Sequence, residues 1–340
     1  MFCDDHTFGG IFVPKYLPRD SFLTPRFCGV RTFMRLPLVE DLAPDIDFAI
    51  IGIPFDGGQS YRSGARFGPE AIRDASILLR PFNQEQKIPI FDYISGVDYG
   101  DCPVVPGYIA ETYQKVETAL QPVVDRGVIP VVLGGDHSIT LAELRALHRC
   151  HGPLGLVHFD SHSDTWDAYF GQKYNHGTTF RRAVEEGLLD PGRVIQVGMR
   201  GPLYGAEDLN AARELGFEVC TTSDLRRIGF EDMVEKIKAR VLPGPVFLSF
   251  DIDFVDPAFA PGTGTPEVGG VTSWEALELV RGLRGIPFIG FDLVEVLPSY
   301  DHAQVTSLLA ANIVYEFLTL IAIAKQERSA CVPCPSIPSV

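Results

Sequence analysis

The sequence predicts an α/β fold in which a mainly parallel sheet is covered by helices on both faces. Short apolar runs alternate with helical patterns along most of the chain, which is the order expected of successive βαβ units. Several of the apolar runs are unbroken, as expected for strands that are buried on both faces. Polar motifs follow the ends of these runs, where open parallel sheets place their binding crevice.

The predicted elements alternate from residue 48 to residue 324. Unbroken apolar runs predict strands over Phe48–Ile53, Val128–Leu133, Leu154–Phe159, Val194–Val197, Val246–Phe250 and Phe288–Phe291. Helical spacing of apolar residues predicts helices over Pro69–Leu79, Glu111–Asp125, Thr140–His148, Thr178–Glu186, Ser273–Leu283 and Val305–Ala324. Asn312 and Glu316 interrupt the last of these, so we expect a buried core helix and no membrane span.

Composition indicates one large globular domain. The chain has 340 residues, of which 46% are hydrophobic and 21% charged, and it lacks an internal linker or charge block. We therefore expect one domain over residues 1–340, with a core over about 30–326 between a peripheral N-terminal arm and a C-terminal tail. The net charge of -15 argues against a nucleic-acid partner, since nucleic-acid binding relies on clustered Lys and Arg.

Cysteine usage and the N-terminus favour a cytoplasmic location. Seven cysteines are spread through the chain, and the first residues lack the basic and apolar regions of a secretory signal. Cys331 and Cys334 form a lone C-x-x-C pair in a Pro-rich tail. A zinc ribbon needs four ligands, so we expect an unstructured terminus there.

Polar motifs follow four of the predicted strands. "GGDHS" comes after the strand that ends at Leu133, "DSHSD" after Phe159, "DIDFVD" after Phe250 and "DLVEV" after Phe291. The carboxyl ends of parallel strands meet at one edge of a sheet, so we expect these motifs to converge there.

The converging motifs supply ligands for metal ions. If the strand continues beyond Phe159, alternation places Asp160, His162 and Asp164 on one face. The complete set has two imidazoles and four carboxylates, from His137, Asp160, His162, Asp164, Asp251 and Asp253. This number exceeds the three protein ligands that are usual for one catalytic zinc ion. An oxygen-rich set without thiolates suits two divalent ions, Mn²⁺ first and Ni²⁺ or Co²⁺ as alternatives.

The pattern also has simpler interpretations. A single Asp-His pair is often a structural hydrogen bond, and a single D-x-D is often a turn or a helix cap. Convergence of three motifs makes those interpretations poor ones here. His158 lies deeper in its strand, and we expect it to be a buried residue behind the ligands. We expect Asp136 either to support the ligands or to cap the helix that begins near Ser138.

Two bound metal ions predict a hydrolase. Such a pair lowers the pKa of a water molecule and supplies hydroxide near neutral pH. The predicted reaction is therefore hydrolysis without a covalent enzyme intermediate.

At the level of whole motifs, the chain resembles the ureohydrolase family of arginases and agmatinases. The matching segments are "GGDHSIT", "HFDSHSDT", "NHGTTFRRA", "SFDIDFVDPAFAPGTGTP" and "GFDLVEVLPSYD", in the same order and spacing. The resemblance runs from "PFDGGQSYRSGARFGP" to the last long helix. It implies a three-layer α/β/α fold, two Mn²⁺ ions, release of urea from a guanidinium group, and assembly as a homo-oligomer, a trimer or hexamer.

The resemblance also implies how the two ions are shared. His137 is expected to bind the first ion and His162 the second. Asp160 and Asp251 are expected to bridge both.

Other roles carry over in the same way. Asp164 matches a ligand of the first ion that also holds the hydroxide, and Asp253 matches a ligand of the second ion. Glu295 matches the carboxylate that pairs with the substrate guanidinium, a role that suits its bidentate geometry. His176 matches the histidine that passes a proton to the leaving amine, although it could simply adjoin the cap of the next helix.

Several residues bear on the identity of the substrate. Arginases carry an Asn-Thr-Pro segment after the metal motif, whereas this chain has Thr165-Trp166-Asp167, which argues against arginine and makes Trp166 a candidate substrate contact. An acidic pocket rim would favour agmatine, and a rim Arg62 or Lys173 would favour 4-guanidinobutyrate or 3-guanidinopropionate. Glu267 contacts either the substrate or only its own loop.

Negative net charge favours agmatine, with guanidine and biguanides as further candidates.

Two other protein classes compete with a ureohydrolase. A silent paralogous subunit of a mixed oligomer is expected to lack ligands, yet all six are present. A one-zinc deacylase is expected to have a different ligand pattern.

Overall fold

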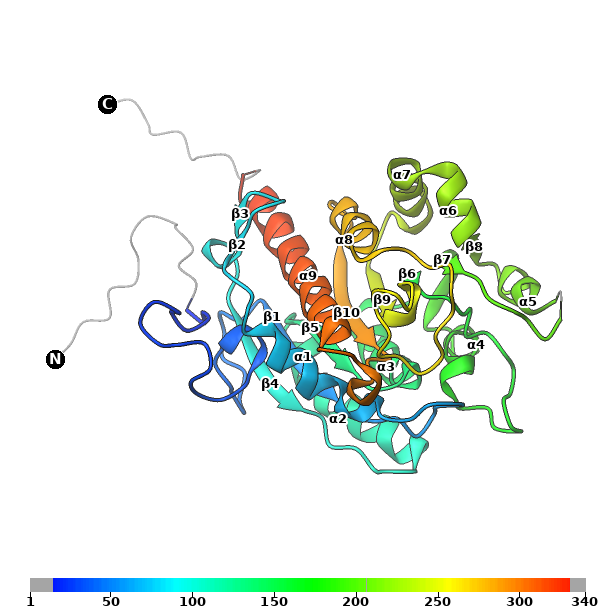
Figure 1. Cartoon of the computed structure of the whole chain (residues 1–340), viewed down its shortest axis with the longest axis horizontal. Helices are drawn as coiled ribbons and strands as arrows, with labels where there is room; N and C mark the ends of the chain where they lie inside the picture. Colours follow the sequence, from blue (N-terminus) through cyan, green and yellow to red (C-terminus); the bar gives the residue numbers. More distant parts are fainter. Residues whose placement is uncertain (1–14, 206, 331–340) are drawn as a thin grey trace.

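A computed structural model describes residues 15–205 and 207–330. Its centre is an eight-stranded sheet in the order β4-β1-β5-β10-β9-β6-β7-β8 (Figure 1). Every neighbouring pair in this sheet is parallel, which confirms the predicted parallel architecture. The strands are β1 (Phe48–Ile53), β4 (Gly96–Asp101), β5 (Ile129–Gly134), β6 (Leu154–Phe159), β7 (Leu189–Met199), β8 (Glu218–Thr221), β9 (Val246–Asp251) and β10 (Phe288–Val294).

Helices cover both faces of this sheet and complete three layers. They are α1 (Gly68–Ser76), α2 (Ile109–Asp125), α3 (Thr140–His151), α4 (Thr179–Glu185), α5 (Asp208–Glu214), α6 (Thr222–Ile228), α7 (Phe230–Val241), α8 (Ser273–Gly282) and α9 (Val305–Ala330). Residues of β1 alternate between two apolar clusters. Phe48 and Ile50 pack in the cluster that contains α1, α7, α8 and α9, whereas Ala49 and Ile51 pack in the cluster that contains α2, α3 and α4.

The long helix α9 is a core helix of this molecule. It is long and apolar enough to cross a membrane, yet 83% of its apolar window is buried inside the protein. Phe317 stacks on Phe291 of β10 with ring centroids 4.9 Å apart. The Glu316 carboxylate accepts hydrogen bonds from Asn83 and Arg281, so the charge that interrupts the apolar run is paired inside the protein.

All six predicted strands are present, with ends that differ by a few residues. The prediction missed both edge strands, β4 and β8, and the helices α5, α6 and α7. In β4, "GVDYGD" has glycines and aspartates that are typical of turns, and β8 is only four residues long. The periodic Met233, Ile237 and Val241 of α7 were a usable helix signal. A short antiparallel hairpin of β2 (Phe82–Asn83) and β3 (Ile88–Pro89) was also missed.

Candidate metal and substrate site

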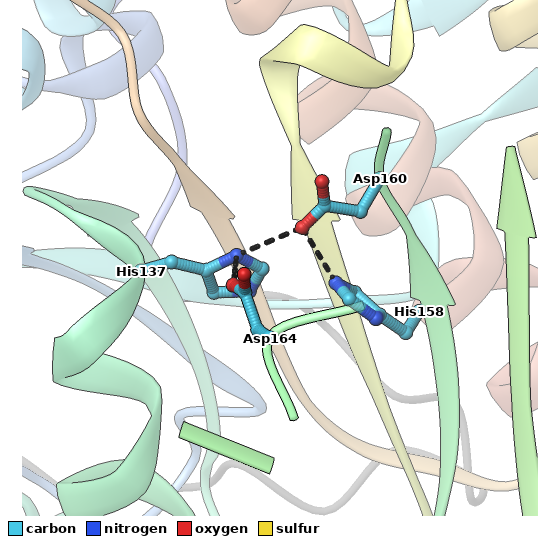
Figure 2. A group of neighbouring side chains, drawn as sticks. All are labelled: His137, His158, Asp160 and Asp164. Atoms are coloured by element: carbon cyan, nitrogen blue, oxygen red, sulfur yellow. Dashed lines mark hydrogen bonds and ion pairs between the residues drawn. The ribbon is translucent and has the colours of Figure 1, made fainter. Parts of the chain in front are cut away.

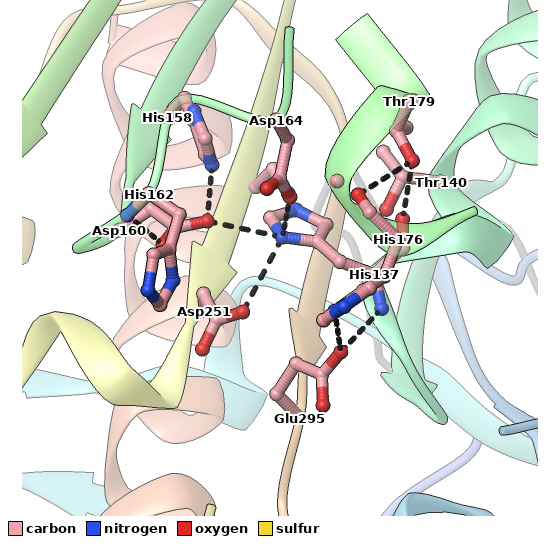
Figure 3. Close-up of polar contacts among 12 residues, drawn as sticks. His137, Thr140, His158, Asp160, His162, Asp164, His176, Thr179, Asp251 and Glu295 are labelled. Atoms are coloured by element: carbon pink, nitrogen blue, oxygen red, sulfur yellow. Dashed lines mark hydrogen bonds and ion pairs between the residues drawn. The ribbon is translucent and has the colours of Figure 1, made fainter. Parts of the chain in front are cut away.

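The four polar motifs converge as the sequence predicts. They follow β5, β10, β9 and β6, which are consecutive in the sheet, so their carboxyl ends lie side by side. The side chains of the motifs meet in one cluster, which is buried except for the half-buried His162 (Figure 3). This juxtaposition brings together all six predicted metal ligands.

Three carboxylates surround one imidazole nitrogen. His137 Nδ1 lies 3.1 Å from Asp160 Oδ2, 3.1 Å from Asp164 Oδ2 and 3.3 Å from Asp251 Oδ2. Figure 2 shows the approach of Asp160 and Asp164 to His137. We call His137, Asp160, Asp164 and Asp251 the first ligand group.

A second group shares Asp160 with the first. His162 Nδ1 lies 3.1 Å from Asp253 Oδ2 and 3.5 Å from Asp160 Oδ1. We call Asp160, His162 and Asp253 the second ligand group. The two oxygens of Asp160 thus face different groups, which is the geometry that a bridging carboxylate requires.

The first ligand group fits a cation. His137 Nδ1 is buried without a hydrogen-bond partner, although three carboxylate oxygens lie close to it. Burial and the nearby Asp253 and Asp160 carboxylates raise the pKa of Asp251 well above its usual range. A shared divalent ion relieves both problems, because it accepts the nitrogen lone pair and neutralises the crowded carboxylates.

Backbone geometry differs from the alternation that the sequence suggested. β6 ends at Phe159, so a turn rather than an extended strand carries Asp160, His162 and Asp164. Asp164 has a φ of 51°, in the left-handed region that non-glycine residues rarely adopt. Glu295 also has a positive φ, of 65°. Strained backbone of this kind concentrates at functional sites, and here it turns both carboxylates into the cluster.

Two further residues orient the ligands from behind. His158 Nε2 lies 2.8 Å from Asp160 Oδ2, and Gln196 Nε2 lies 3.0 Å from His158 Nδ1. Because the amide nitrogen of Gln196 can only donate, His158 Nδ1 accepts, and His158 Nε2 carries the proton that is donated to Asp160. His158 therefore occupies the supporting position that the sequence suggested.

Asp136 has the capping role that was expected of it. Its carboxylate accepts from Ser138 N–H at 3.0 Å and from Gly58 N–H at 2.7 Å. Burial, followed by the neighbouring Glu295, raises the pKa of Asp136 to about 7. The contact ties the loop at Gly58 to the short helix that presents His137.

Glu295 and His176 form a buried ion pair beside the first ligand group. Glu295 Oε1 lies 3.2 Å from His176 Nδ1 and accepts from His137 N–H at 3.0 Å (Figure 3). Burial opposes both charges, but their hydrogen bond, their opposite charges and the neighbouring polar groups together outweigh it. The pKa of Glu295 is therefore lowered and that of His176 raised. Gln59 Nε2 donates to Glu295 Oε2 at 2.8 Å, and Ser60 Oγ lies 2.8 Å from His176 Nε2.

Sequence reasoning missed several supporting residues. Gln59 and Ser60 lie in "PFDGGQSYRSGARFGP", a matching segment in which only Arg62 received a candidate role. Ser249 was also missed, and its hydroxyl lies 2.8 Å from His137 Nε2. A hydroxyl at that nitrogen leaves Nδ1 free to face the carboxylates.

A pocket of about 330 Å³ opens from the second ligand group towards solvent. Trp166 lines it, packs over Gly177 beside His176, and stacks on Tyr169 with ring centroids 4.7 Å apart. Glu267 also lines the pocket, as does Asp208. The lining places Trp166 and Glu267 where the distal part of a substrate would lie.

Comparison with known proteins agrees with this geometry. The arginase family pattern matches residues 46–319. Guanidinobutyrase of Pseudomonas aeruginosa is 47% identical over 299 residues, which cover 87% of this chain and 94% of that protein. Mitochondrial agmatinase of Gallus gallus is 42% identical over 305 residues, which cover 90% and 89%.

Solved structures give the same result. Proclavaminate amidino hydrolase from Streptomyces clavuligerus superposes with a TM-score of 0.85 at 42% identity, over 88% of this chain and 100% of that one. The sheet order, the shared ligand groups and these similarities lead to one conclusion. The chain belongs to the arginase family and is a hydrolase of amidine carbon–nitrogen bonds.

Proposed function

We propose that the chain hydrolyses a guanidino compound to urea and an amine, with agmatine, which yields putrescine, as the first candidate. One observation carries the reaction class. Two ligand groups share Asp160, and the Glu295 carboxylate lies beside them. A planar guanidinium bound by Glu295 would lie next to the two groups, where its central carbon can be attacked.

The residues that would hold two divalent ions are the first and second ligand groups. We propose Mn²⁺, with Ni²⁺ or Co²⁺ as alternatives, because the set is rich in carboxylate oxygen and contains no thiolate. Bound divalent ions supply Lewis acidity, which makes water a nucleophile near neutral pH.

The chain's own side chains orient the substrate and move protons. Glu295 holds the guanidinium in register through paired hydrogen bonds, for which its negative charge is already set by His176. His176 carries a proton within 3.2 Å of Glu295, where the leaving amine can receive it. Asp164 is the second candidate for this proton relay. Trp166 and Tyr169 wall the pocket and reduce the access of bulk water.

The pocket lining supports a cationic distal group. Glu267 and Asp208 contribute carboxylates, and among the described residues neither Arg62 nor Lys173 lines the pocket. The Arg200 guanidinium lines it but donates to backbone carbonyls, so it is poorly placed to bind a substrate carboxylate. Agmatine ends in an ammonium and suits this lining.

A guanidino acid is the second candidate, and a specific observation favours it. The relative named guanidinobutyrase shares 47% identity with this chain, more than the 42% of the relative named agmatinase. Arginine, guanidine and biguanides remain in the test because pocket charge alone does not separate them.

A urea-release panel decides between these substrates. Protein loaded with Mn²⁺, or with Ni²⁺, is assayed on agmatine, 4-guanidinobutyrate, 3-guanidinopropionate, arginine, guanidine and a biguanide. The proposal expects the highest kcat/KM on agmatine. Preference for a guanidino acid would replace agmatine but keep the reaction class. No urea from any compound would instead support a silent subunit that needs a paralogous partner.

We also propose a cytoplasmic homo-oligomer, a trimer or hexamer. Large apolar side chains that are close in sequence are exposed near the N-terminal end of the described chain, at Phe22, Leu23, Phe27 and Val30. Exposed apolar surface of this kind is typical of a region that another protein covers. Light scattering on the purified protein measures the mass, and a monomer at micromolar concentration would contradict the proposal.

A further inference from the structure

Arg200 connects the second ligand group with the wall of the pocket. It follows β7, whose neighbour β6 carries Asp160, and the strand beyond β6 is β9. The Arg200 side chain therefore reaches past the end of β6 to the residues that follow β9. Its backbone N–H donates to Ser161 O at 3.0 Å, between the ligands Asp160 and His162.

The guanidinium has an unusual set of partners. Within the described chain, its hydrogen-bond partners are all backbone carbonyl oxygens, at Gly198, Asp253, Phe254, Val255 and Glu267. The shortest contacts are 2.5 Å from Nη2 to Asp253 O and 2.8 Å from Nη2 to Glu267 O. A guanidinium offers five N–H donors in a rigid plane and can bind several carbonyls at once. A lysine ammonium cannot reproduce this arrangement.

Glycines shape the seat of the guanidinium. A Cβ at Gly270 would lie 2.6 Å from Arg200 Nη2, and a Cβ at Gly201 would lie 2.4 Å from the Glu267 carboxyl carbon. A Cβ at Gly270 would also lie 2.5 Å from the backbone nitrogen of Asp256, so a side chain there requires movement of both Arg200 and the main chain, and one at Gly201 requires movement of Glu267. The close packing shows that the seat is built around the guanidinium.

The same contacts fix the orientation of Asp253. The Asp253 side chain accepts from Ser161 N–H at 3.1 Å and from the Ser161 hydroxyl at 2.7 Å. Its backbone carbonyl accepts from the Arg200 guanidinium, whereas Ser161 O accepts from the Arg200 backbone N–H. Asp253 is thereby fixed at its side chain through Ser161 and at its main chain through the guanidinium.

We propose that Arg200 is a positioning residue. It fixes Asp253, of the second ligand group, relative to Glu267, of the pocket wall. This inference rests on the proposed two-metal function. Loss of the guanidinium removes these donors from the carbonyls after β9 and frees the main chain of Asp253. Binding of the second ion weakens, whereas the first ligand group, which Arg200 does not contact, keeps its ion.

Metal titration of chelator-treated protein tests this proposal. Arg200→Lys keeps the charge but lacks the planar set of donors. Arg240→Lys is the matched control, since Arg240 also binds backbone carbonyls, Val194 O and Pro191 O, but at the opposite end of β7. Equilibrium dialysis with Mn²⁺ gives the number of ions per chain and the two dissociation constants.

In Arg200→Lys, one of the two ions is expected to bind roughly 10- to 100-fold more weakly, while the other binds as in the wild type. Arg240→Lys is expected to bind both ions normally. Two unchanged dissociation constants in Arg200→Lys would overturn the proposal. So would equal weakening of both ions, which indicates a general structural role.

The outcome for the wild type separates this inference from the proposed function. A wild-type chain that binds fewer than two ions contradicts the two-metal function itself. If the wild type binds two ions and Arg200→Lys binds both with unchanged dissociation constants, only the role of Arg200 is contradicted. If Arg200→Lys does not fold, Gly270→Ala decides the matter. Its added Cβ meets both Arg200 Nη2 and the backbone nitrogen of Asp256, so the guanidinium must move. The same selective weakening is expected, and normal binding of both ions would overturn the proposal.

Discussion

Asp160 is the residue shared by the two ligand groups. Its Oδ2 faces His137 and its Oδ1 faces His162, and His158 donates a hydrogen bond to it from behind. Burial would raise the pKa of Asp160, but the surrounding histidines lower it well below its usual range. Asp160 is therefore a charged carboxylate that is ready to bridge two cations.

Replacement of Asp160 is expected to damage both groups at once. Asp160→Asn removes the bridging charge, so we expect loss of urea release and fewer than two Mn²⁺ ions per chain by elemental analysis. Asp167→Asn is the matched control, because Asp167 is close in sequence but its side chain is 69% exposed. Full activity and two ions in Asp160→Asn would contradict the bridging assignment.

Glu143, on α3 shortly after His137, is a second informative residue. It is fully buried on α3, and neither carboxylate oxygen has a hydrogen-bond partner within the described residues. Burial, with a contribution from Asp292, raises the pKa of Glu143 well above 4.5. The folded protein therefore keeps a proton on Glu143 at pH values where the unfolded chain has lost it.

This difference predicts how stability depends on pH. Folding retains a proton above pH 4.5, so the contribution of Glu143 to stability falls as pH rises from about 4.5 to its raised folded-state pKa, by up to ~1.4 kcal/mol per pH unit. We expect Glu143→Gln to remove this slope and to be more stable than the wild type at pH 7. Urea denaturation between pH 5 and pH 8 measures it. Glu111→Gln, at an exposed position of α2, is the control. Equal slopes in the wild type and Glu143→Gln would refute the assignment.

Among the elements, α9 makes the largest apolar contribution to one face of the sheet. Its buried residues run from Leu309 to Ile323, and they pack in the cluster that contains β10, which leads into Glu295. The packing of α9 therefore supports the strand that leads into Glu295, the carboxylate proposed to bind the substrate guanidinium. A helix of this apolarity is stable in water because most of its surface is covered by the rest of the protein.

Truncation of one aromatic side chain tests this packing. Phe317→Ala removes the stack on Phe291 and opens a cavity, so we expect a loss of about 3–5 kcal/mol in the free energy of unfolding. Urea denaturation followed by fluorescence measures the loss. Phe82→Ala, at a half-exposed position of β2, serves as the control and is expected to change stability by less than about 1 kcal/mol. A similar loss of unfolding free energy in both variants would show that the packing of α9 stabilises the fold no more than a half-exposed side chain of β2 does.

For the molecule as a whole, the ligand groups join strands from both halves of the sheet. β5 and β10 lie towards the β4 edge, and β9 and β6 lie towards the β8 edge. Four carboxylates gathered at this junction repel one another unless cations neutralise them. The site therefore couples metal binding to the stability of the entire fold.

Metal removal is expected to lower thermal stability. A ligand that binds only the folded state adds about 2.7 kcal/mol at a hundredfold excess over its Kd, so Mn²⁺ is expected to raise the Tm of chelator-treated protein. Differential scanning calorimetry with and without Mn²⁺ measures the rise, and Asp160→Asn is expected to show a smaller one. An equal rise in the wild type and the variant would place the binding elsewhere.

Much of this architecture could be predicted from the sequence. Unbroken apolar runs such as Leu154–Phe159 mark strands that are buried on both faces, and the parallel order places the motifs after them at one edge. The edge strand β4 was missed because its glycines and aspartates resemble a turn, and only pairing with β1 makes it a strand. The extent of a single domain over residues 1–340 stays a prediction, and the Cys331/Cys334 pair lies outside the described residues.

The sequence by itself determined which residues can bind metal, because residue type and strand-end position depend only on local pattern. Tertiary structure alone decided how they divide, with Asp160 between two groups and His137 Nδ1 facing three carboxylates. It also decided that a turn with a positive φ at Asp164 aims that carboxylate, where alternation along a strand was expected. Local periodicity cannot encode such contacts, because Ser249, Gln59 and Arg200 reach the site from distant segments and act only once the sheet has formed.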